Sequence, residues 1–298
     1  MRFSFWPNPS QPYSDVLALA QHVERTGWDG FWYADHFMPN AEDTSAPWPE
    51  AWTTISAIAA CVPRLRIGTL VTGNTYRHPA VLAKMAATLD HISEGRVVLG
   101  LGAGWQENEH AQYGLDFYDV PQRLARLDEA CQVINSLYQH TKASFAGQFY
   151  QLTDATLEPK PIQQPLPLMV GGGGEKVTLR ITAEHAHEWN VWGTVETLQQ
   201  KMSVLDAHCK SFDRDPNEIQ RSAVALLFMS DDEAYVAKMK QADLQQAAII
   251  GSVEEVAEII RQYEKIGVNE LIVPEFTLGP MEAKLAILDT FIQQVAQR

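Results

Sequence analysis

Two apolar patterns alternate along the chain. Short runs of apolar residues, typical of buried strands, are followed by longer segments in which apolar side chains recur every three or four positions, as on one helix face. The runs predict strands over residues 2–6, 30–35, 65–72, 95–102, 167–172, 188–193, 219–229 and 270–274. The longer segments predict helices over 14–27, 50–62, from Pro79 onward, and over 121–140, 174–186, 194–213, 252–267 and 280–296.

These segments form eight strand–helix pairs. The strands are continuous apolar runs, which indicates that both of their faces are buried, as in a parallel sheet covered by helices. Eight pairs favour a closed (β/α)8 TIM barrel over an open doubly wound sheet. Such a barrel needs about 250 residues, so we expect one domain over 1–298 with two insertions. A hairpin-like, proline-rich insertion at 141–167 follows the fourth strand, and an amphipathic helical one at 231–248 follows the seventh.

Charge and cysteine usage narrow the classes of function. The chain has 23 Lys and Arg against 37 Asp and Glu, a formal charge of −14, so we expect no nucleic-acid partner. No apolar run approaches the roughly 20 residues that cross a membrane, and the N-terminal segment lacks the apolar stretch of a signal peptide. Cys61, Cys131 and Cys209 form no CxxC pair, which favours a reduced, cytoplasmic protein.

In a barrel of this kind, the residues after the carboxyl ends of the strands form the functional site. The clearest signal is the glycine run at 171–174, between a predicted strand and a predicted helix. Its backbone amides could approach an anion at the helix N-terminus; the alternative is a tight turn. Asp35 and His36 follow the second strand. A histidine there could exchange a proton near neutral pH or simply hold the loop.

Aromatic residues gather at or near the same predicted strand ends. Trp6, Trp48, Trp105 and Trp192 could wall a pocket for a planar ligand or substrate, although packing under loops explains each of them singly.

Metal binding is not expected. Glu107, Glu109 and His110 stand close together, and His185 and His187 flank one residue. Neither group has the spacing of a known metal site.

Four segments carry a resemblance to a known family. They are WYADHF at 32–37, the block at 68–105 that contains RHP and ends in GLGAGW, LMVGGGGEKVTLR at 168–180, and VEEVAEIIRQYEKIGVNELIV at 253–273. The chain resembles the bacterial luciferase-like monooxygenase superfamily, and within it most resembles the oxidoreductases that use the deazaflavin coenzyme F420. The resemblance implies the same (β/α)8 fold, an oxidoreductase activity, and F420 as cofactor, with FMN as the alternative.

The resemblance also implies roles for single residues. Asp35 and His36 would lie beside the reactive face of the cofactor ring, with His36 as the catalytic proton carrier. A bulge with a non-proline cis peptide would fall at Thr72 and Gly73, beside Asn74. The turn at Gly104 would border the ring. The residues implied for the cofactor phosphate are Gly171, Gly172, Gly173, Gly174 and Glu175.

The chain departs from the family's sugar-phosphate dehydrogenases at two positions. Asn40 stands where they carry a tryptophan four residues after the histidine, and Trp105 stands where they carry a glutamate after the glycine turn. Both departures argue against glucose 6-phosphate as the substrate, and they weaken the catalytic assignment of His36.

We therefore expect hydride transfer between F420 and a small organic substrate. The nearest alternative is an FMN-dependent monooxygenase that uses reduced flavin and O2. A separate flavin or F420 reductase would then be the redox partner. Two further alternatives are a non-redox enzyme on a phosphate-binding barrel and a non-catalytic flavin-binding barrel. The resemblance also implies a homodimer.

Overall fold

The computed structural model describes residues 1–296, so the last two residues of the predicted domain, 297–298, lie outside the described residues. Its barrel strands are β1 (Arg2–Trp6), β2 (Gly30–Tyr33), β3 (Arg66–Thr69), β5 (Val97–Gly102), β8 (Leu168–Gly171), β9 (Glu188–Trp192), β10 (Gln220–Val224) and β13 (Glu270–Pro274). All neighbouring pairs are parallel, and the pairings of β3 with β5 and of β1 with β13 close the ring. The predicted (β/α)8 barrel is confirmed.

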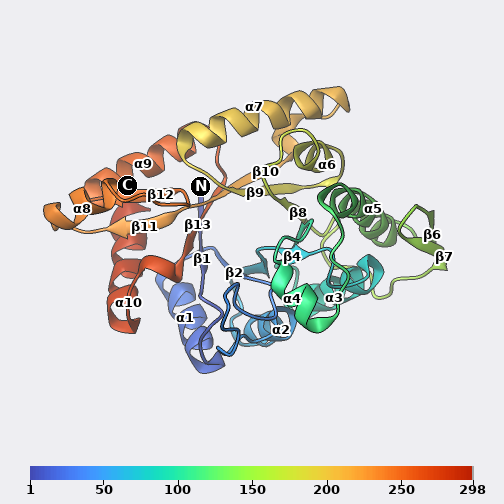
Figure 1. Cartoon of the computed structure of the whole chain (residues 1–298), viewed down its shortest axis with the longest axis horizontal. Coiled ribbons are helices and arrows are strands. Elements are labelled where there is room, and N and C mark those ends of the chain that lie inside the picture. The colour runs from blue at the N-terminus through green and yellow to red at the C-terminus, as the bar shows by residue number, and fades with distance from the viewer. Residues whose placement is uncertain (297–298) are drawn as a thin grey trace.

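Helices surround the barrel (Figure 1). They are α1 (Tyr13–Thr26), α2 (Ala51–Cys61), α3 (Pro79–Ile92), α4 (Glu107–Tyr113), α5 (Val120–Gln139), α6 (Thr178–His185), α7 (Val195–Ser211), α8 (Glu233–Lys240), α9 (Val253–Lys265) and α10 (Met281–Thr290). Two 3₁₀ turns, η1 (Pro216–Glu218) and η2 (Glu275–Thr277), and a π-helical turn, η3 (Phe291–Val295), complete them. Within residues 1–296, no helix combines the length and apolar character needed to span a bilayer.

Apolar packing and helix caps explain these elements. The outward side chains of the strands and the inner faces of the helices form the main core, and a second apolar cluster that includes Trp32 and Met169 fills the barrel interior. Ser252 and Glu255 form the predicted capping box at the start of α9. The two residues satisfy backbone donors that a helix start leaves free, which stabilises the boundary.

The predicted strand over 65–72 is interrupted. β3 ends at Thr69, and the short strand β4 (Thr72–Gly73) resumes beside β5 after a cis peptide bond between Leu70 and Val71. The resemblance implied this bond at Thr72 and Gly73, so its position is corrected by two residues. The Val71 side chain lies against glycines of β5 and β8, and that tertiary packing is not visible in the local sequence.

The first predicted insertion contains the antiparallel hairpin of β6 (Ala143–Ala146) and β7 (Gln151–Ala155). It projects from one edge of the molecule beside α5 (Figure 1). The Glu129 carboxylate of α5 accepts the backbone N–H groups of Gln148, Phe149 and Tyr150 at 2.7, 2.9 and 3.1 Å. This single side chain therefore ties the hairpin turn to the barrel.

The second predicted insertion is only partly helical. The strand predicted over 219–229 divides at Ala225 into β10 and β11 (Leu226–Met229), because β11 leaves the barrel and pairs in parallel with β12 (Ala248–Gly251). The helix predicted over 231–248 is limited to α8, and the chain then turns back to form β12. These elements lie together at the opposite edge from the hairpin (Figure 1).

Candidate functional site

A cavity of about 620 Å³ lies at the carboxyl ends of the barrel strands. Its size falls within the range of about 300–1,000 Å³ that is typical of small-molecule sites. The predicted site residues that line it are Trp6, His36, Thr72, Gly73, Gly104, Trp105, Gly171, Gly172, Gly173 and Trp192. The predicted residues outside its lining are Asp35, Trp48, Asn74, Gly174 and Glu175.

His36 follows β2 and is held by a carboxylate from α4. Its Nδ1 lies 2.9 Å from Oε1 of Glu109, and the other oxygen of this fully buried carboxylate accepts the backbone N–H of Phe37 at 2.7 Å. Because a carboxylate accepts the Nδ1 proton, the neutral imidazole carries its hydrogen on Nδ1 and keeps a free lone pair on Nε2. Within residues 1–296, Nε2 has no protein partner.

Tyr76 completes this group. Its hydroxyl donates a hydrogen bond to Glu109 and lies 3.2 Å from Nδ1 of His36. Burial and the Glu109 carboxylate raise the pKa of Tyr76, so the phenol stays protonated. Burial alone would raise the pKa of Glu109, but the hydrogen bonds from His36, Phe37 and Tyr76 lower it overall. Glu109 therefore remains a charged acceptor for the imidazole.

The sequence did not reveal Glu109 as a partner of His36. The apolar pattern predicts no helix between residues 102 and 121, but this segment contains α4, and Glu109 lies in its first turn. Glu109 stands four residues beyond Trp105, the position where the sugar-phosphate dehydrogenases carry a glutamate. The signal in the sequence is the cluster of Glu107, Glu109 and His110, which does not indicate a partner for His36.

Asp35 lies outside the cavity lining, next to His36. It is fully buried, and the Arg77 guanidinium donates to its two oxygens at 2.7 and 3.2 Å and to Glu50 at 2.6 Å. Burial raises the pKa of the Asp35 carboxyl, and the Arg77 charge opposes that change. Glu50 also caps α2 through the N–H groups of Trp52 and Thr53. This ion-pair network joins the loop that carries His36 to α2 and to the segment before α3.

Glycines leave room for Val71 beside the cavity. A Cβ atom placed on Gly100, Gly102 or Gly171 would lie 3.0, 2.9 or 2.8 Å from a Val71 methyl carbon. Real Cβ atoms rarely come so close, so these positions on β5 and β8 suit glycine. The result is that the Val71 side chain packs closely against the backbone of β5 and β8 at the edge of the cavity.

The glycine run forms the loop after β8. The Gly172 carbonyl accepts the Trp189 indole N–H at 2.8 Å, and the Gly173 carbonyl accepts the Lys201 ammonium at 2.7 Å. Helix α6 begins at Thr178 and not at the predicted residue 174, because residues 175–177 form a turn first. Thr178 lines the cavity. The sequence did not indicate Lys201, which reaches the loop from α7.

Aromatic side chains line two other parts of the cavity, with Trp6 and Trp192 in one and Trp105 beside His36 in the other. The ring centroid of Trp6 lies 5.9 Å from that of Trp192 and 5.0 Å from that of Phe276. Trp105 is 61% exposed and meets the His36 ring edge to face at 5.3 Å. The Trp6 indole N–H is buried and has no hydrogen-bond partner within residues 1–296.

Besides Asp35, four predicted site residues lie outside the cavity lining. Buried Asn74 donates to the Tyr150 hydroxyl at 3.1 Å. Trp48 is half-buried in the loop before α2. Gly174 accepts the Leu179 N–H at 3.0 Å, and exposed Glu175 lies 3.7 Å from Lys201.

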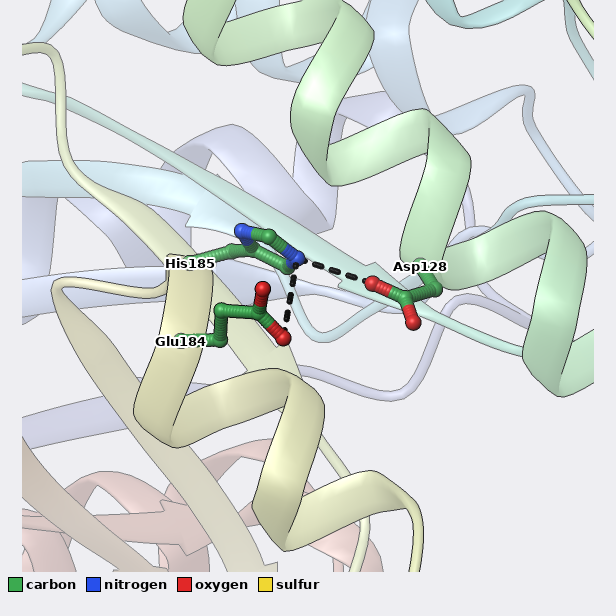
Figure 2. Close-up of side chains that lie close together, drawn as sticks. All are labelled: Asp128, Glu184 and His185. Atoms are coloured by element: carbon green, nitrogen blue, oxygen red, sulfur yellow. Dashed lines mark hydrogen bonds and ion pairs between the residues drawn. The ribbon is translucent and has the colours of Figure 1, made fainter. Parts of the chain in front are cut away.

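A separate acidic group lies between α5 and α6 (Figure 2). The Nε2 atom of His185 is 2.8 Å from Asp128 and 3.7 Å from Glu184. Arg180 pairs with both carboxylates, at 2.5 Å to Asp128 and 2.8 Å to Glu184. The guanidinium already supplies the positive charge that a metal ion would bring, so we interpret this group as an ion-pair network that links two helices.

A closed parallel barrel with a cavity at the carboxyl ends of its strands is the architecture of ligand-binding (β/α)8 proteins. The sequence profile of the luciferase-like monooxygenase family matches residues 1–239, and the chain belongs to that family. The family implied by the sequence motifs is thus confirmed.

Similar curated proteins include F420-dependent glucose-6-phosphate dehydrogenases. One from Amycolatopsis mediterranei is 38% identical over 165 residues, which cover 55% of this chain and 49% of that protein. Another from Kineococcus radiotolerans is 39% identical over 162 residues, which cover 54% and 47%. The chain spans about half the length of the curated relatives it matches.

Solved structures share the fold over the whole chain. The coenzyme F420-dependent tetrahydromethanopterin reductase of Methanopyrus kandleri has a TM-score of 0.84 at 18% identity, covering 99% of this chain and 98% of that one. An F420-dependent secondary alcohol dehydrogenase has a TM-score of 0.85 at 20% identity, with the same coverage of 99% and 98%. These similarities establish the barrel fold.

Proposed function

We propose that this protein is an F420-dependent oxidoreductase that transfers hydride between the coenzyme and a small organic substrate. The observation that carries the proposal is the glycine-lined surface around Val71, which lies in the same cavity as His36. The glycines that line this side of the cavity, Gly73, Gly102, Gly104 and Gly171–Gly173, bring no side chains into it, which leaves room for a planar ring. The F420-dependent relatives, at 38% and 39% identity, support a deazaflavin over FMN.

The residues that would hold the coenzyme lie on the glycine side of the cavity. The ring would rest on Val71 beside Gly73 and Gly104, and the phosphate would meet the loop at the backbone amide of Gly173, since the Gly172 amide already donates to the Asn190 carbonyl at 2.9 Å. The Thr178 hydroxyl and the Lys201 ammonium lie next to that loop. Backbone amides at the start of a helix and a nearby cation are the usual partners of a phosphate.

When bound, such a coenzyme supplies a two-electron hydride acceptor or donor, and the protein supplies position and proton transfer. In this chain, Nε2 of His36 would take the proton from a substrate hydroxyl, or return it to a carbonyl oxygen in the reverse direction. Glu109 would orient the imidazole and stabilise the imidazolium that forms. Glu109 is thus a positioning residue, and His36 is the catalytic one.

The deciding experiment is a titration of the purified protein with F420 and, separately, with FMN, followed by fluorescence. We expect saturable binding of F420, and no O2-dependent product from the reduced complex. Binding of FMN without F420, with oxygenation of a substrate, would establish the monooxygenase alternative. Binding of neither cofactor would favour a non-redox barrel enzyme, and binding without turnover of any substrate would favour a non-catalytic flavin-binding barrel.

We further propose that residues 1–298 act as one domain, in the cytoplasm, as a homodimer served by a separate flavin or F420 reductase. Cys131 and Cys209 are buried free thiols, which supports a reducing compartment. Light scattering of the purified protein tests the dimer, and a mass close to the 33.3 kDa of one chain would contradict it.

A further inference from the structure

The cavity has two unlike halves, which the order of strands around the barrel separates. Strands β3, β5 and β8 are consecutive, and glycines such as Gly102 and Gly171 line the cavity there. Strands β9, β10, β13 and β1 follow in the ring, and Trp192 and Trp6 stand at the ends of two of them. We name these the glycine half and the aromatic half. His36 follows β2, which lies between the two halves.

We infer that the aromatic half receives an uncharged, mainly apolar substrate with one alcohol or carbonyl oxygen, and that it discriminates against sugar phosphates and other anions. The inference rests on the proposed function, because it assigns the glycine half to the coenzyme. It goes further because it defines the substrate class, and it separates this chain from the sugar-phosphate dehydrogenases that share 38% identity with part of it.

The charges around the cavity support this inference. Within the described part of the chain, no Lys, Arg, Asp or Glu side chain lines the cavity. Arg77 is committed to Asp35 and Glu50, and Lys201 donates to Gly173 in the glycine half. An anion in the aromatic half would lose hydration without gaining a cationic side chain, which is strongly unfavourable.

The polar groups of the aromatic half are neutral. The Trp6 indole N–H is buried and has no partner within residues 1–296, so it is not exposed to the cavity. Asn190 lines the cavity and donates to Ser222 at 2.9 Å. Gln246, from the segment before β12, brings an exposed amide to the lining. Together with the Trp6 and Trp192 rings, these groups suit an apolar body that carries one polar oxygen.

The test compares neutral and anionic probes that each contain a six-membered ring. Cyclohexanol, cyclohexanone, cyclohexanecarboxylate and glucose 6-phosphate are titrated into the protein, and tryptophan fluorescence reports occupancy without a coenzyme. Trp192→Phe identifies the part of the signal that comes from the cavity. With F420 present, kcat/KM is then measured for cyclohexanol and for glucose 6-phosphate. We expect the neutral probes to bind, and cyclohexanol to be preferred over glucose 6-phosphate by about 100-fold or more.

A variant that adds a positive charge tests whether the lack of a cationic side chain in the lining causes the discrimination against anions. Gln246→Lys places a cation in the lining, whereas Gln245→Lys places one at an exposed neighbouring position outside it. We expect only Gln246→Lys to strengthen binding of cyclohexanecarboxylate, by about 10-fold, and this gain to decrease with added salt. No effect of Gln246→Lys on anion binding would contradict the electrostatic explanation.

Different results would contradict the substrate inference and the proposed function. Equal or tighter binding of glucose 6-phosphate or cyclohexanecarboxylate by the unmodified protein, or no response to either neutral probe, would overturn the substrate inference even if F420 binds. Absence of F420 binding would overturn the proposed function, and the coenzyme-free titration would still decide the substrate class.

Discussion

The Nδ1 nitrogen of His36 lies 2.9 Å from the Oε1 oxygen of Glu109, although the two residues are 73 positions apart in the chain. This pair orients a histidine whose other ring nitrogen has no protein partner within residues 1–296. We predict that Glu109→Gln lowers kcat by about 10–100-fold and changes its pH profile, because the imidazolium loses its charged partner. F420 affinity should change little. Glu107→Gln, at an exposed position of the same helix, is the matched control.

A double-mutant cycle tests whether Glu109 acts through His36. His36→Ala should lower kcat by about 10²–10⁴-fold with little change in the dissociation constant of F420, which is measured by fluorescence titration. Adding Glu109→Gln to His36→Ala should cause no further loss, since residues that act as a unit are not additive. Multiplicative losses would show that Glu109 has an independent role. Equal loss of turnover and F420 binding in His36→Ala would refute the proton-transfer assignment.

The sequence contains enough information for the barrel but not for the contacts inside it. Apolar runs and helical periodicity predict the eight strand–helix pairs, because burial on two faces leaves a local pattern. The packing around Val71 leaves no such local pattern, because Gly100 and Gly171, which lie against it, belong to two other strands. Local patterns carry no information about which glycine faces which side chain.

The same limit applies to charged partners. Glu109 belongs to a helix of seven residues, too short for its periodicity to identify, and Lys201 reaches the glycine loop from a helix beyond the next strand. The glycine run and the Asp35–His36 pair were visible because their residues are adjacent in sequence. Asp35 and His36 are neighbours in the sequence but have different roles. The buried Asp35 carboxylate pairs with Arg77 and supports the site, and the sequence does not distinguish this role from that of His36.

The Gly172 backbone provides a test of the proposed phosphate loop. Gly172 has φ of 133°, and a Cβ atom there would lie 3.2 Å from Thr178. Gly172→Ala should therefore lower the free energy of unfolding by about 1 kcal/mol and weaken F420 binding by about 10-fold, because the loop must shift. Gly27→Ala controls for backbone strain, since Gly27 has φ of 95° with open space around it at the end of α1.

Fluorescence titration and thermal denaturation separate the two effects. Both variants should be less stable, and only Gly172→Ala should bind F420 more weakly. Equal F420 affinity in the two variants would argue against a role of this loop in coenzyme binding.

Glu129 should hold the turn of the β6–β7 hairpin in place. Its carboxylate accepts three consecutive backbone N–H groups, those of Gln148, Phe149 and Tyr150, and hydrogen bonds to a charged acceptor are worth about 1.5–3 kcal/mol each. We predict that Glu129→Ala lowers the free energy of unfolding by about 2–4 kcal/mol and speeds hydrogen exchange of those three amides. Glu42→Ala, in an exposed loop, is the control. Unchanged exchange at 148–150 would contradict this role of the carboxylate.

Asp128 should make stability depend on pH in the acidic range. Burial would raise the pKa of its carboxyl, but hydrogen bonds from His185 and Arg180 lower it from 3.8 to about 2. Because the pKa is lower in the folded protein, the carboxylate stabilises the fold above about pH 4, and this contribution disappears as the pH falls toward about 2. The full shift corresponds to about 2 kcal/mol, reduced to about 1 kcal/mol by partial solvent exposure.

Asp128→Asn should therefore lower the free energy of unfolding at pH 7 by about 1 kcal/mol, as measured by urea denaturation. The difference from the unmodified protein should decrease between about pH 4 and about pH 2, since the unmodified protein loses the same contribution as the pH falls through this range. Asp243→Asn, in an exposed loop, controls for the removal of one negative charge. If the effect of Asp128→Asn stays constant down to about pH 3, the ion-pair network does not hold this carboxylate in its charged form.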